Sequence, residues 1–247
     1  MKTILLSIAG YLLRRILKNK IRSGNNIINT NNKLVNNLTV ALVYFNRYEK
    51  DEIYLCKKYL KSEIDIVELG TSIGVVASNT QQHFDVSKMV CVEANPLLNN
   101  LLKKTIKLND FKNTVLVNVA ISDSDQPIFF SSRGSNELGK IVKHSEIKVN
   151  AKSLQLIIKE NNILDYNLVC DIEGTECSFI LGEGLKNCQL AIIELHSSVW
   201  KGRYYSIDDL SYIIQEMGFD LLENINKTFV FKRIANKTNT ALNRNLA

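Results

Sequence analysis

From residue 64 onward, short apolar runs alternate with segments whose apolar residues recur at helical spacing. This alternation constrains the fold most, because strands that alternate with helices build a mostly parallel sheet with helices on both faces. We predict strands over residues 64–70, 89–95, 114–122, 127–132, 166–174 and 190–196. We predict helices over residues 74–83, 96–108, 151–161, 176–185 and 206–219, followed by a hairpin over 220–234. The expected fold class is therefore α/β, with an antiparallel hairpin strand that closes the sheet.

The turn after the first predicted strand reads "GTSIG" and permits two interpretations. It matches G-x-S-x-G, the turn that exposes a nucleophilic serine at the top of a sheet. Ser72, Asp171 and His196 also occur in the order of a hydrolase triad, so a serine hydrolase using Ser72 is one alternative. Residues 1–63 contain neither clear strands nor an oxyanion loop such as HGGG, which argues against a hydrolase.

The second interpretation of this turn is a cofactor loop. Glycine permits a tight turn and a close approach to the next helix, and a carboxylate that ends the second strand accepts hydrogen bonds from ribose hydroxyls. An acid two residues before the loop suits a cationic cofactor such as S-adenosylmethionine better than a pyrophosphate. The predicted cofactor-binding residues of the first two strands and the turn are Glu68, Gly70, Thr71, Ser72, Gly74 and Glu93. Asn118 and Asp123, after the third strand, are the candidates for the adenine edge.

Acidic residues and a histidine gather at the carboxyl ends of the predicted strands 166–174 and 190–196. Ligands of open α/β sheets bind beyond the carboxyl ends of the strands, so Asp171, Glu173, Glu194 and His196 are the predicted catalytic residues. His196 is the expected general base, because the ordinary pKa of histidine is about 6.5. Two alternatives stay open. Asp171 and Glu194 could bind Mg²⁺, which would acidify a hydroxyl, and Glu176 could merely cap the short helix that follows it.

Three aromatic residues, Trp200, Tyr204 and Tyr205, follow the predicted strand 190–196. Aromatic side chains of this kind stack on sugar rings, and they also cover apolar cores. The residues alone favour neither role over the other.

Basic residues are concentrated at the two ends of the chain. Residues 1–48 contain eight Lys or Arg and no acid, and residues 232–247 contain four more and again no acid. The other 19 basic residues are outnumbered by all 25 acidic residues. A body of this charge repels phosphate on average, so we expect no nucleic-acid partner. The five cysteines contain no CxxC pair, which is typical of buried thiols in a reducing, cytoplasmic compartment.

We expect three parts: an N-terminal helix with an Asn-rich linker (1–48), a main domain (49–235) and a basic tail (236–247). The predicted helix lies within residues 1–22 and is too short to span a bilayer, which takes about 20 apolar residues. It could lie on an anionic membrane surface through its apolar and basic residues. Alternatively, it could pack on the main domain with its basic side chains in solvent.

Several segments together resemble the FkbM family of S-adenosylmethionine-dependent methyltransferases over about residues 60–200. They read, in order, "DIVELGTSIGVVAS", "VCVEANP", "VLVNVAISDSD", "YNLVCDIEGTE" and "AIIELH". The resemblance implies a class I methyltransferase (Rossmann-like) fold with a seven-stranded sheet of order 3-2-1-4-5-7-6. It also implies O-methylation, typically of sugar or polyketide hydroxyls. The chain departs from the family pattern at "GTSIG", commonly Gly-Ala-Asn-x-Gly, and at Val169, often a lysine.

The expected function is an S-adenosylmethionine-dependent O-methyltransferase that acts on a sugar, glycan or glycolipid precursor. The basic amino terminus would hold the enzyme near a membrane that carries the acceptor. A catalytically silent scaffold with the same cofactor fold is the non-enzymatic alternative.

Overall fold

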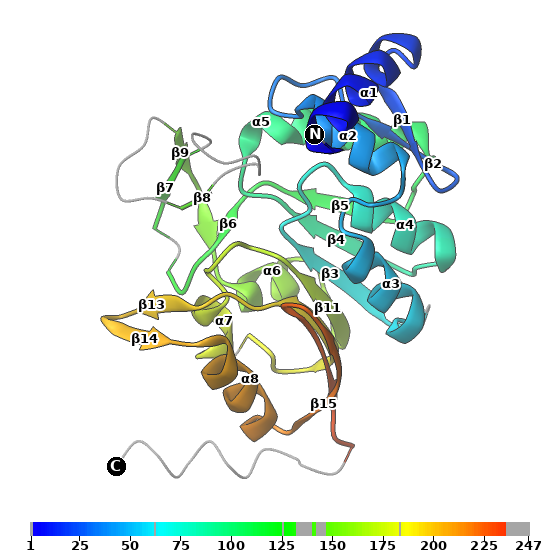
Figure 1. Ribbon diagram of the computed structural model, residues 1–247. Coiled ribbons are helices and arrows are strands. Elements are labelled where there is room, and N and C mark those ends of the chain that lie inside the picture. The colour runs from blue at the N-terminus through cyan, green and yellow to red at the C-terminus, as the bar shows by residue number, and fades with distance from the viewer. Residues whose placement is uncertain are drawn as a thin grey trace, which may run out of the picture.

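The computed structural model describes residues 2–61, 63–124, 126–131, 140–141, 147–182 and 184–235. Figure 1 shows a central sheet with helices on both sides. The predicted basic tail, 236–247, and Ser132 at the end of a predicted strand lie outside the described residues. The division of the chain into appendage, main domain and tail stays a prediction.

The helices are α1 (Lys2–Ile16), α2 (Asn37–Tyr44), α3 (Lys50–Tyr59), α4 (Val75–His83), α5 (Pro96–Leu108), α6 (Leu154–Glu160), α7 (Cys177–Ile180) and α8 (Ile207–Glu216). The strands of the main sheet are β3 (Asp65–Leu69), β4 (Met89–Val92), β5 (Thr114–Val117), β11 (Tyr166–Cys170), β12 (Cys188–Glu194), β15 (Phe219–Ile225) and β16 (Thr228–Arg233). The remaining strands are β1 (Lys20–Ser23), β2 (Asn26–Asn29), β6 (Ala120–Ile121), β7 (Ile128–Ser131), β8 (Lys140–Ile141), β9 (Ile147–Val149), β10 (Ala151–Lys152), β13 (Ser198–Trp200) and β14 (Arg203–Tyr205).

The main sheet has seven strands in the order β15-β16-β12-β11-β3-β4-β5. Read from β5 and numbered along the chain, this is the expected order 3-2-1-4-5-7-6. β12, β11, β3, β4 and β5 pair in parallel, whereas β16 runs antiparallel to both of its neighbours. The strand order reverses between β3 and β11, so the carboxyl ends of these two strands form the crevice in which ligands bind in such folds.

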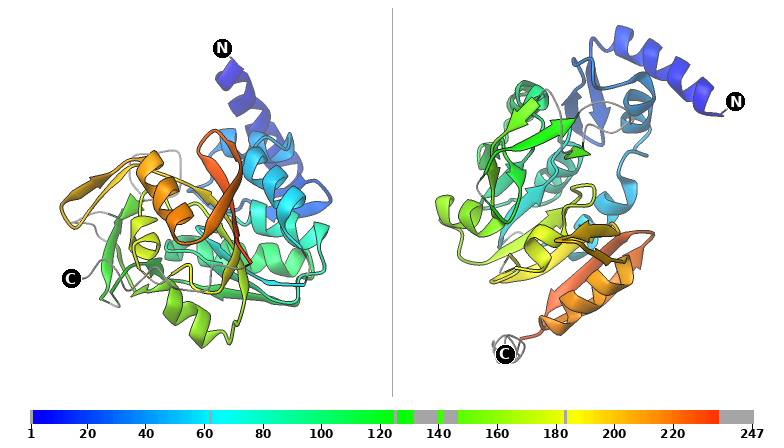
Figure 2. Two further views of the ribbon diagram at one scale, coloured as in Figure 1. Left: turned by 90° about the horizontal axis from the view of Figure 1, so that it is seen from below. Right: turned by 90° about the vertical axis from the view of Figure 1, so that its left-hand side faces the viewer.

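Helices cover both faces of the sheet (Figures 1 and 2). On one face, α6, α7 and α8 contribute Ile157, Phe179 and Leu210 to the larger core. On the other face, α3 and α4 contribute Leu55 and Val76 to a second core. Every residue of β4 and of β11 is buried. This burial explains why these strands read as continuous apolar runs rather than as alternating ones.

Two predicted helices, α5 and α8, begin at the capping residues that the sequence indicates. The Asn95 side chain accepts from the Leu97 amide, and Pro96 occupies the first turn of α5. Ser206 and Asp209 form a reciprocal capping box at the start of α8. These two helix starts confirm the sequence predictions.

The segment predicted as an Asn-rich linker instead contains an ordered hairpin, β1–β2, followed by α2. Ile21 and Ile28 of the hairpin are fully buried in a third core that also includes residues of α2, α4 and α5. The asparagines hold the hairpin in place. Asn26 Nδ2 donates to the Ser78 carbonyl of α4 at 3.1 Å, and Asn32 Nδ2, just after the hairpin, donates to the Leu97 carbonyl of α5 at 2.8 Å. Asn richness therefore serves tertiary hydrogen bonds here, and α1 ends at Ile16, within the range predicted for the N-terminal helix.

The third predicted strand, 114–122, is divided in two. β5 ends at Val117, and β6 pairs with β10 in a separate small sheet. Asn118 explains the break, because its Nδ2 donates to the carbonyl oxygen of Glu93 at 2.7 Å and so holds the chain against the end of β4.

Candidate active site

The turn from Gly70 to Gly74 joins the end of β3 to α4. The amides of Gly70 and Thr71 both donate to the Val92 carbonyl at the end of β4, at 2.9 and 3.1 Å. Gly70 has a φ of 84° and Gly74 a φ of 82°, a left-handed conformation that costs glycine little. The predicted strand–turn–helix unit is therefore confirmed, and the turn lies against the next strand.

Gly70 also permits a close approach between β3 and β11. A Cβ atom at Gly70 would lie 1.7 Å from the Asp171 carbonyl oxygen. The Asp171 amide donates to the Leu69 carbonyl at 3.0 Å. Cys170, the last residue of β11, pairs with Leu69 on one side and with Ile193 of β12 on the other. Asp171 is thus placed at the point of strand reversal, between the turn and the end of β12.

Glu93 ties the turn to the end of β4. Its Oε2 accepts from the Ser72 amide at 2.8 Å, and its Oε1 accepts from the Asn95 amide at 2.7 Å. Burial raises the pKa of Glu93 to about 7. A carboxylate offers about four acceptor sites, so two remain beside the two backbone amides. Glu93 therefore fits the predicted role of accepting hydrogen bonds from ribose hydroxyls.

Glu68 does not present a charge to the turn as predicted. It is buried, and burial raises its pKa to about 8. The Cys91 thiol donates to Glu68 Oε2 at 3.6 Å, and the Ala77 amide of α4 also contacts the carboxyl. Because its pKa lies above neutral pH, Glu68 is mainly uncharged. It accepts a hydrogen bond from the Ala77 amide of α4 and does not attract a cation.

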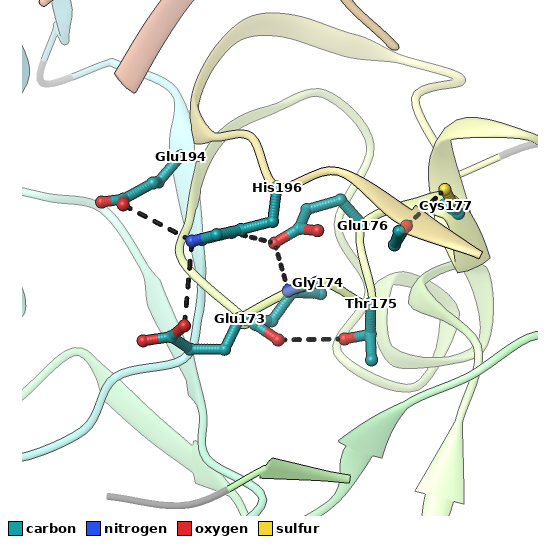
Figure 3. A network of polar contacts seen from close by, with 9 residues as sticks. Glu173, Gly174, Thr175, Glu176, Cys177, Glu194 and His196 are labelled. Atoms are coloured by element: carbon teal, nitrogen blue, oxygen red, sulfur yellow. Dashed lines mark hydrogen bonds and ion pairs between the residues drawn. The ribbon is translucent and has the colours of Figure 1, made fainter. Parts of the chain in front are cut away.

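His196 is surrounded by three glutamates (Figure 3). Its Nδ1 lies 3.0 Å from Glu176 Oε1, and its Nε2 lies 3.5 Å from Glu194 Oε1 and 3.7 Å from Glu173 Oε2. Hydrogen bonds to Glu176 and Glu194 raise the pKa of His196 to about 10. The prediction that His196 is the general base is therefore corrected, because an imidazolium at neutral pH cannot accept a proton.

Glu176 and Glu173 hold this arrangement by different means. The Glu176 side chain is fully buried, and its Oε1 also accepts from the Gly174 amide at 3.0 Å. It makes no side-chain cap of α7, so its structural role is to orient His196 rather than to cap the helix. Glu173 has a φ of 56°, which turns the chain sharply after β11 and brings its carboxylate back toward His196. The resulting cluster of Glu173, Glu176, Glu194 and His196 is called the imidazolium cluster below.

Asp171 lies beside the imidazolium cluster and has the properties of a base. Burial, followed by repulsion from the charges of Glu194 and Glu173, raises the pKa of Asp171 to about 7. Its Oδ1 is buried without a hydrogen-bond partner among the described residues. An unpartnered carboxylate oxygen with a pKa near neutral suits proton abstraction.

Two further acids, one just before α3 and one in its first turn, reach this region, and neither was predicted from the sequence. Burial is the main cause that raises the pKa of Glu49 and of Glu52, and repulsion from Asp171 contributes to both. Glu49 directly precedes α3 and has a φ of 47°. Next to it, the Tyr48 hydroxyl lies 3.3 Å from Ser72 Oγ. The available signal was the spacing of the two glutamates, with Glu49 just before α3 and Glu52 in its first turn.

Neither the hydrolase nor the metal alternative gains support. Ser72 Oγ contacts Tyr48, while both ring nitrogens of His196 face glutamates, so the Ser72–His196–Asp171 triad is not assembled. Among the described residues, no group of three or more His, Cys, Asp or Glu is arranged to hold a metal ion. Glu194, a predicted magnesium ligand, pairs with His196, which lowers the pKa of Glu194.

The other predicted contact residues have structural partners. Asn118 donates a hydrogen bond to the Glu93 carbonyl at the end of β4. Asp123 Oδ2 forms an ion pair with Lys201 Nζ at 3.0 Å. Trp200 and Tyr205 of the β13–β14 hairpin pack against the larger core, whereas Tyr204 is exposed. The core-covering interpretation therefore holds for two of the three aromatic residues.

The imidazolium cluster predicts a pH dependence of stability. The raised pKa of His196 contributes stability that is complete below the unfolded pKa of about 6.5 and is lost as the pH rises through about 10. We expect wild type to lose about 1–2 kcal/mol more than His196→Gln between neutral pH and about pH 10.5, after allowing for solvent screening. Urea unfolding of both proteins at the two pH values measures this difference. Equal losses would contradict the protonated state of His196.

The strand order, the glycine turn and Glu93 at the end of β4 define the fold of a class I S-adenosylmethionine-dependent methyltransferase. A family model described as the methyltransferase FkbM domain matches residues 68–221. This match covers more than half of the chain, and the chain belongs to the FkbM methyltransferase family. Comparison with curated proteins found no match.

Solved structures with a similar fold include other methyltransferases. TYW2 from M. jannaschii, in complex with AdoMet, is 13% identical, with 86% of this chain and 85% of that chain covered and a TM-score of 0.44. Precorrin-6y C5,15-methyltransferase from Geobacter metallireducens GS-15 is 10% identical, with 74% and 86% covered and a TM-score of 0.43.

Proposed function

We propose that this methyltransferase transfers the methyl group of S-adenosylmethionine to a hydroxyl of a sugar, glycan or glycolipid precursor. The observation that carries the proposal is the buried, unpartnered Oδ1 of Asp171 at the point of strand reversal. The family supports methyl transfer in general, and a carboxylate base supports an oxygen nucleophile in particular. An amine nucleophile attacks as its neutral form, whereas an alcohol must lose a proton during the transfer.

The residues at the carboxyl ends of β3 and β4 fit the cofactor. When bound, S-adenosylmethionine supplies an electrophilic methyl group on a sulfonium ion. Glu93, with two acceptor sites left beside the Ser72 and Asn95 amides, would bind the ribose hydroxyls. Gly70 and Gly74 adopt the left-handed conformation that the turn requires, and the missing Cβ of Gly70 lets the turn lie directly against the Asp171 backbone beside the proposed cofactor site.

Asp171 would take up the proton of the acceptor hydroxyl. A base with a pKa near 7 combines a useful ionised fraction at neutral pH with adequate basicity. The imidazolium of His196 partly neutralises Glu173 and Glu194, which lie around the same site. Without this positive charge the pKa of Asp171 would be higher, because the nearby glutamates repel its ionised form. His196 is thus a positioning residue that adjusts the base.

The cofactor assignment is tested with Glu93→Gln. We expect the Kd for S-adenosylmethionine, measured by titration calorimetry, to rise about 10–100-fold, because a hydrogen bond to a charged group contributes about 1.5–3 kcal/mol. Glu216→Gln, at an exposed position at the end of α8, is the matched control and should bind as wild type does. Equal affinities for all three proteins would remove Glu93 from the cofactor site.

The acceptor class is tested by the chemistry of the product. Purified enzyme is incubated with radiolabelled S-adenosylmethionine and extracts of glycans and glycolipids. A methyl ether of a sugar hydroxyl survives mild alkali, whereas a methyl ester is hydrolysed. Label that is stable to alkali and recovered in monosaccharides after acid hydrolysis supports the proposal. Label released by alkali, or recovered on an amine, would overturn it.

A further inference from the structure

Helix α1 carries an exposed apolar face that the fold does not use. The five residues of this face are between 51% and 74% exposed: Ile4, Leu5, Ile8, Leu12 and Ile16. Each helical residue advances by about 100°, so residues spaced by four stay close to one line along the helix. The five side chains therefore form one continuous strip, called the α1 strip below. Scattered exposed apolar residues are ordinary, but a contiguous strip marks an interaction surface.

The opposite side of α1 already packs on the protein. A Cβ atom at Gly10 would lie 1.7 Å from the carbonyl oxygen of Asn37, so α1 and α2 are in backbone contact there. Leu13 and Leu17 pack against the third core, which includes the β1–β2 hairpin. The helix is thus apolar on two sides, of which only one is covered. The α1 strip contributes nothing to the packing of the described fold.

The position of α1 leaves this strip accessible. Figure 2 shows in both views that the amino-terminal part of α1 extends beyond the body of the protein. Among the described residues, no helix is long and apolar enough to cross a membrane. The 15 residues of α1 measure only about 22 Å, less than the hydrocarbon core of a bilayer, which is about 30 Å thick.

The positive charge of this region indicates which kind of partner binds the α1 strip. Residues 1–48 contain eight Lys or Arg and no acid, and Arg15, Lys18 and Lys20 are exposed at or just after the end of α1. A second copy of the chain docked through the same strip would bring like charges together. An anionic lipid surface accepts both the apolar strip and the positive charges.

We propose that α1 lies in the headgroup region of an anionic membrane, with the α1 strip directed toward the acyl chains. The third core links α1 to the catalytic region, because it joins residues of α2 and the β1–β2 hairpin to Ile73 of the cofactor turn. Membrane binding would therefore hold the cofactor turn at a fixed distance from the lipid surface. The proposal is independent of the acceptor class, because it concerns binding rather than turnover.

The test uses the full chain and flotation with vesicles of phosphatidylcholine, with and without about 30% phosphatidylglycerol. We expect wild type to float with the anionic vesicles and to bind the neutral ones about tenfold or more weakly. The double variant Ile8→Glu/Leu12→Glu should lose binding to anionic vesicles by about tenfold or more. Leu164→Glu, at an 82% exposed leucine outside this region, is the matched control and should bind as wild type does.

Circular dichroism and thermal unfolding establish that the double variant is folded. Equal flotation of the double variant and wild type would overturn the proposal and assign binding to charge alone. Sedimentation velocity without lipid provides a second measurement. A wild-type dimer that the double variant dissociates would also overturn the proposal, because the strip would then be a subunit interface. Unchanged methyl transfer to a water-soluble acceptor by a variant that no longer floats separates membrane binding from catalysis.

Discussion

Asp171→Asn is expected to lower the rate of methyl transfer by about 10²–10⁴-fold, the usual contribution of a general base. The change is nearly isosteric, and it removes both the ability to accept a proton and the negative charge of the carboxylate. Affinity for S-adenosylmethionine should stay within about twofold of wild type, because Glu93 and the turn supply the cofactor contacts. Rates are measured as S-adenosylhomocysteine formation under saturating cofactor.

Two controls separate loss of a base from loss of structure. Asp165→Asn makes the same change at the exposed residue before β11 and should leave the rate unchanged. The raised pKa of Asp171 means that its ionisation destabilises the folded state as the pH rises above the unfolded value of about 3.9. Asp171→Asn should therefore be at least as stable as wild type at about pH 8. A variant that is slow because it is unfolded would not satisfy this condition.

The pH profile supplies the outcome that would contradict this role. The wild-type rate should rise between about pH 6 and pH 8 as Asp171 loses its proton, and the residual rate of Asp171→Asn should not. A variant that retains both the wild-type rate and its pH dependence would exclude Asp171 as the base.

Gly70→Ala is expected to lower the free energy of unfolding by about 3–5 kcal/mol, the range of severe substitutions with a named cause. Two effects combine at this position. The φ of 84° disfavours a side chain, and the added Cβ would lie 1.7 Å from the Asp171 carbonyl oxygen. β3 and β11 would have to separate at the point of strand reversal. Urea denaturation measures the loss.

Gly202→Ala is the matched control for this substitution. Gly202 has a φ of 82°, but a Cβ there would meet no atom within 4 Å. Its cost should be limited to the conformational effect of about 1–2 kcal/mol. If both variants lose the same free energy, the close approach of β3 and β11 contributes nothing to the cost of Gly70→Ala.

Many helices and strands of the fold can be predicted from residues that are close in sequence. Apolar runs of strand length, Pro96 at the start of one helix and Ser206 before another predict the elements, because backbone conformation and helix capping depend on residues near in sequence. The order of the parallel strands came from the resemblance to a family rather than from periodicity. The hairpin β1–β2 was missed because the asparagines in and just after it bond to α4 and α5, whose positions the local sequence does not specify.

The candidate site likewise has features that the sequence predicts and features that depend on the tertiary structure. The glycine turn, Glu93, the acids after β11 and the acid that ends β12 could be identified from their positions at strand ends. Their protonation states could not, because a pKa depends on burial and on the charges that the fold brings near. His196 looks like a base in the sequence and becomes an imidazolium among three glutamates, whereas Asp171 acquires a pKa near 7. The local sequence determines which residues form the site. Long-range packing determines which of them can accept a proton, because it sets their burial and the charges around them.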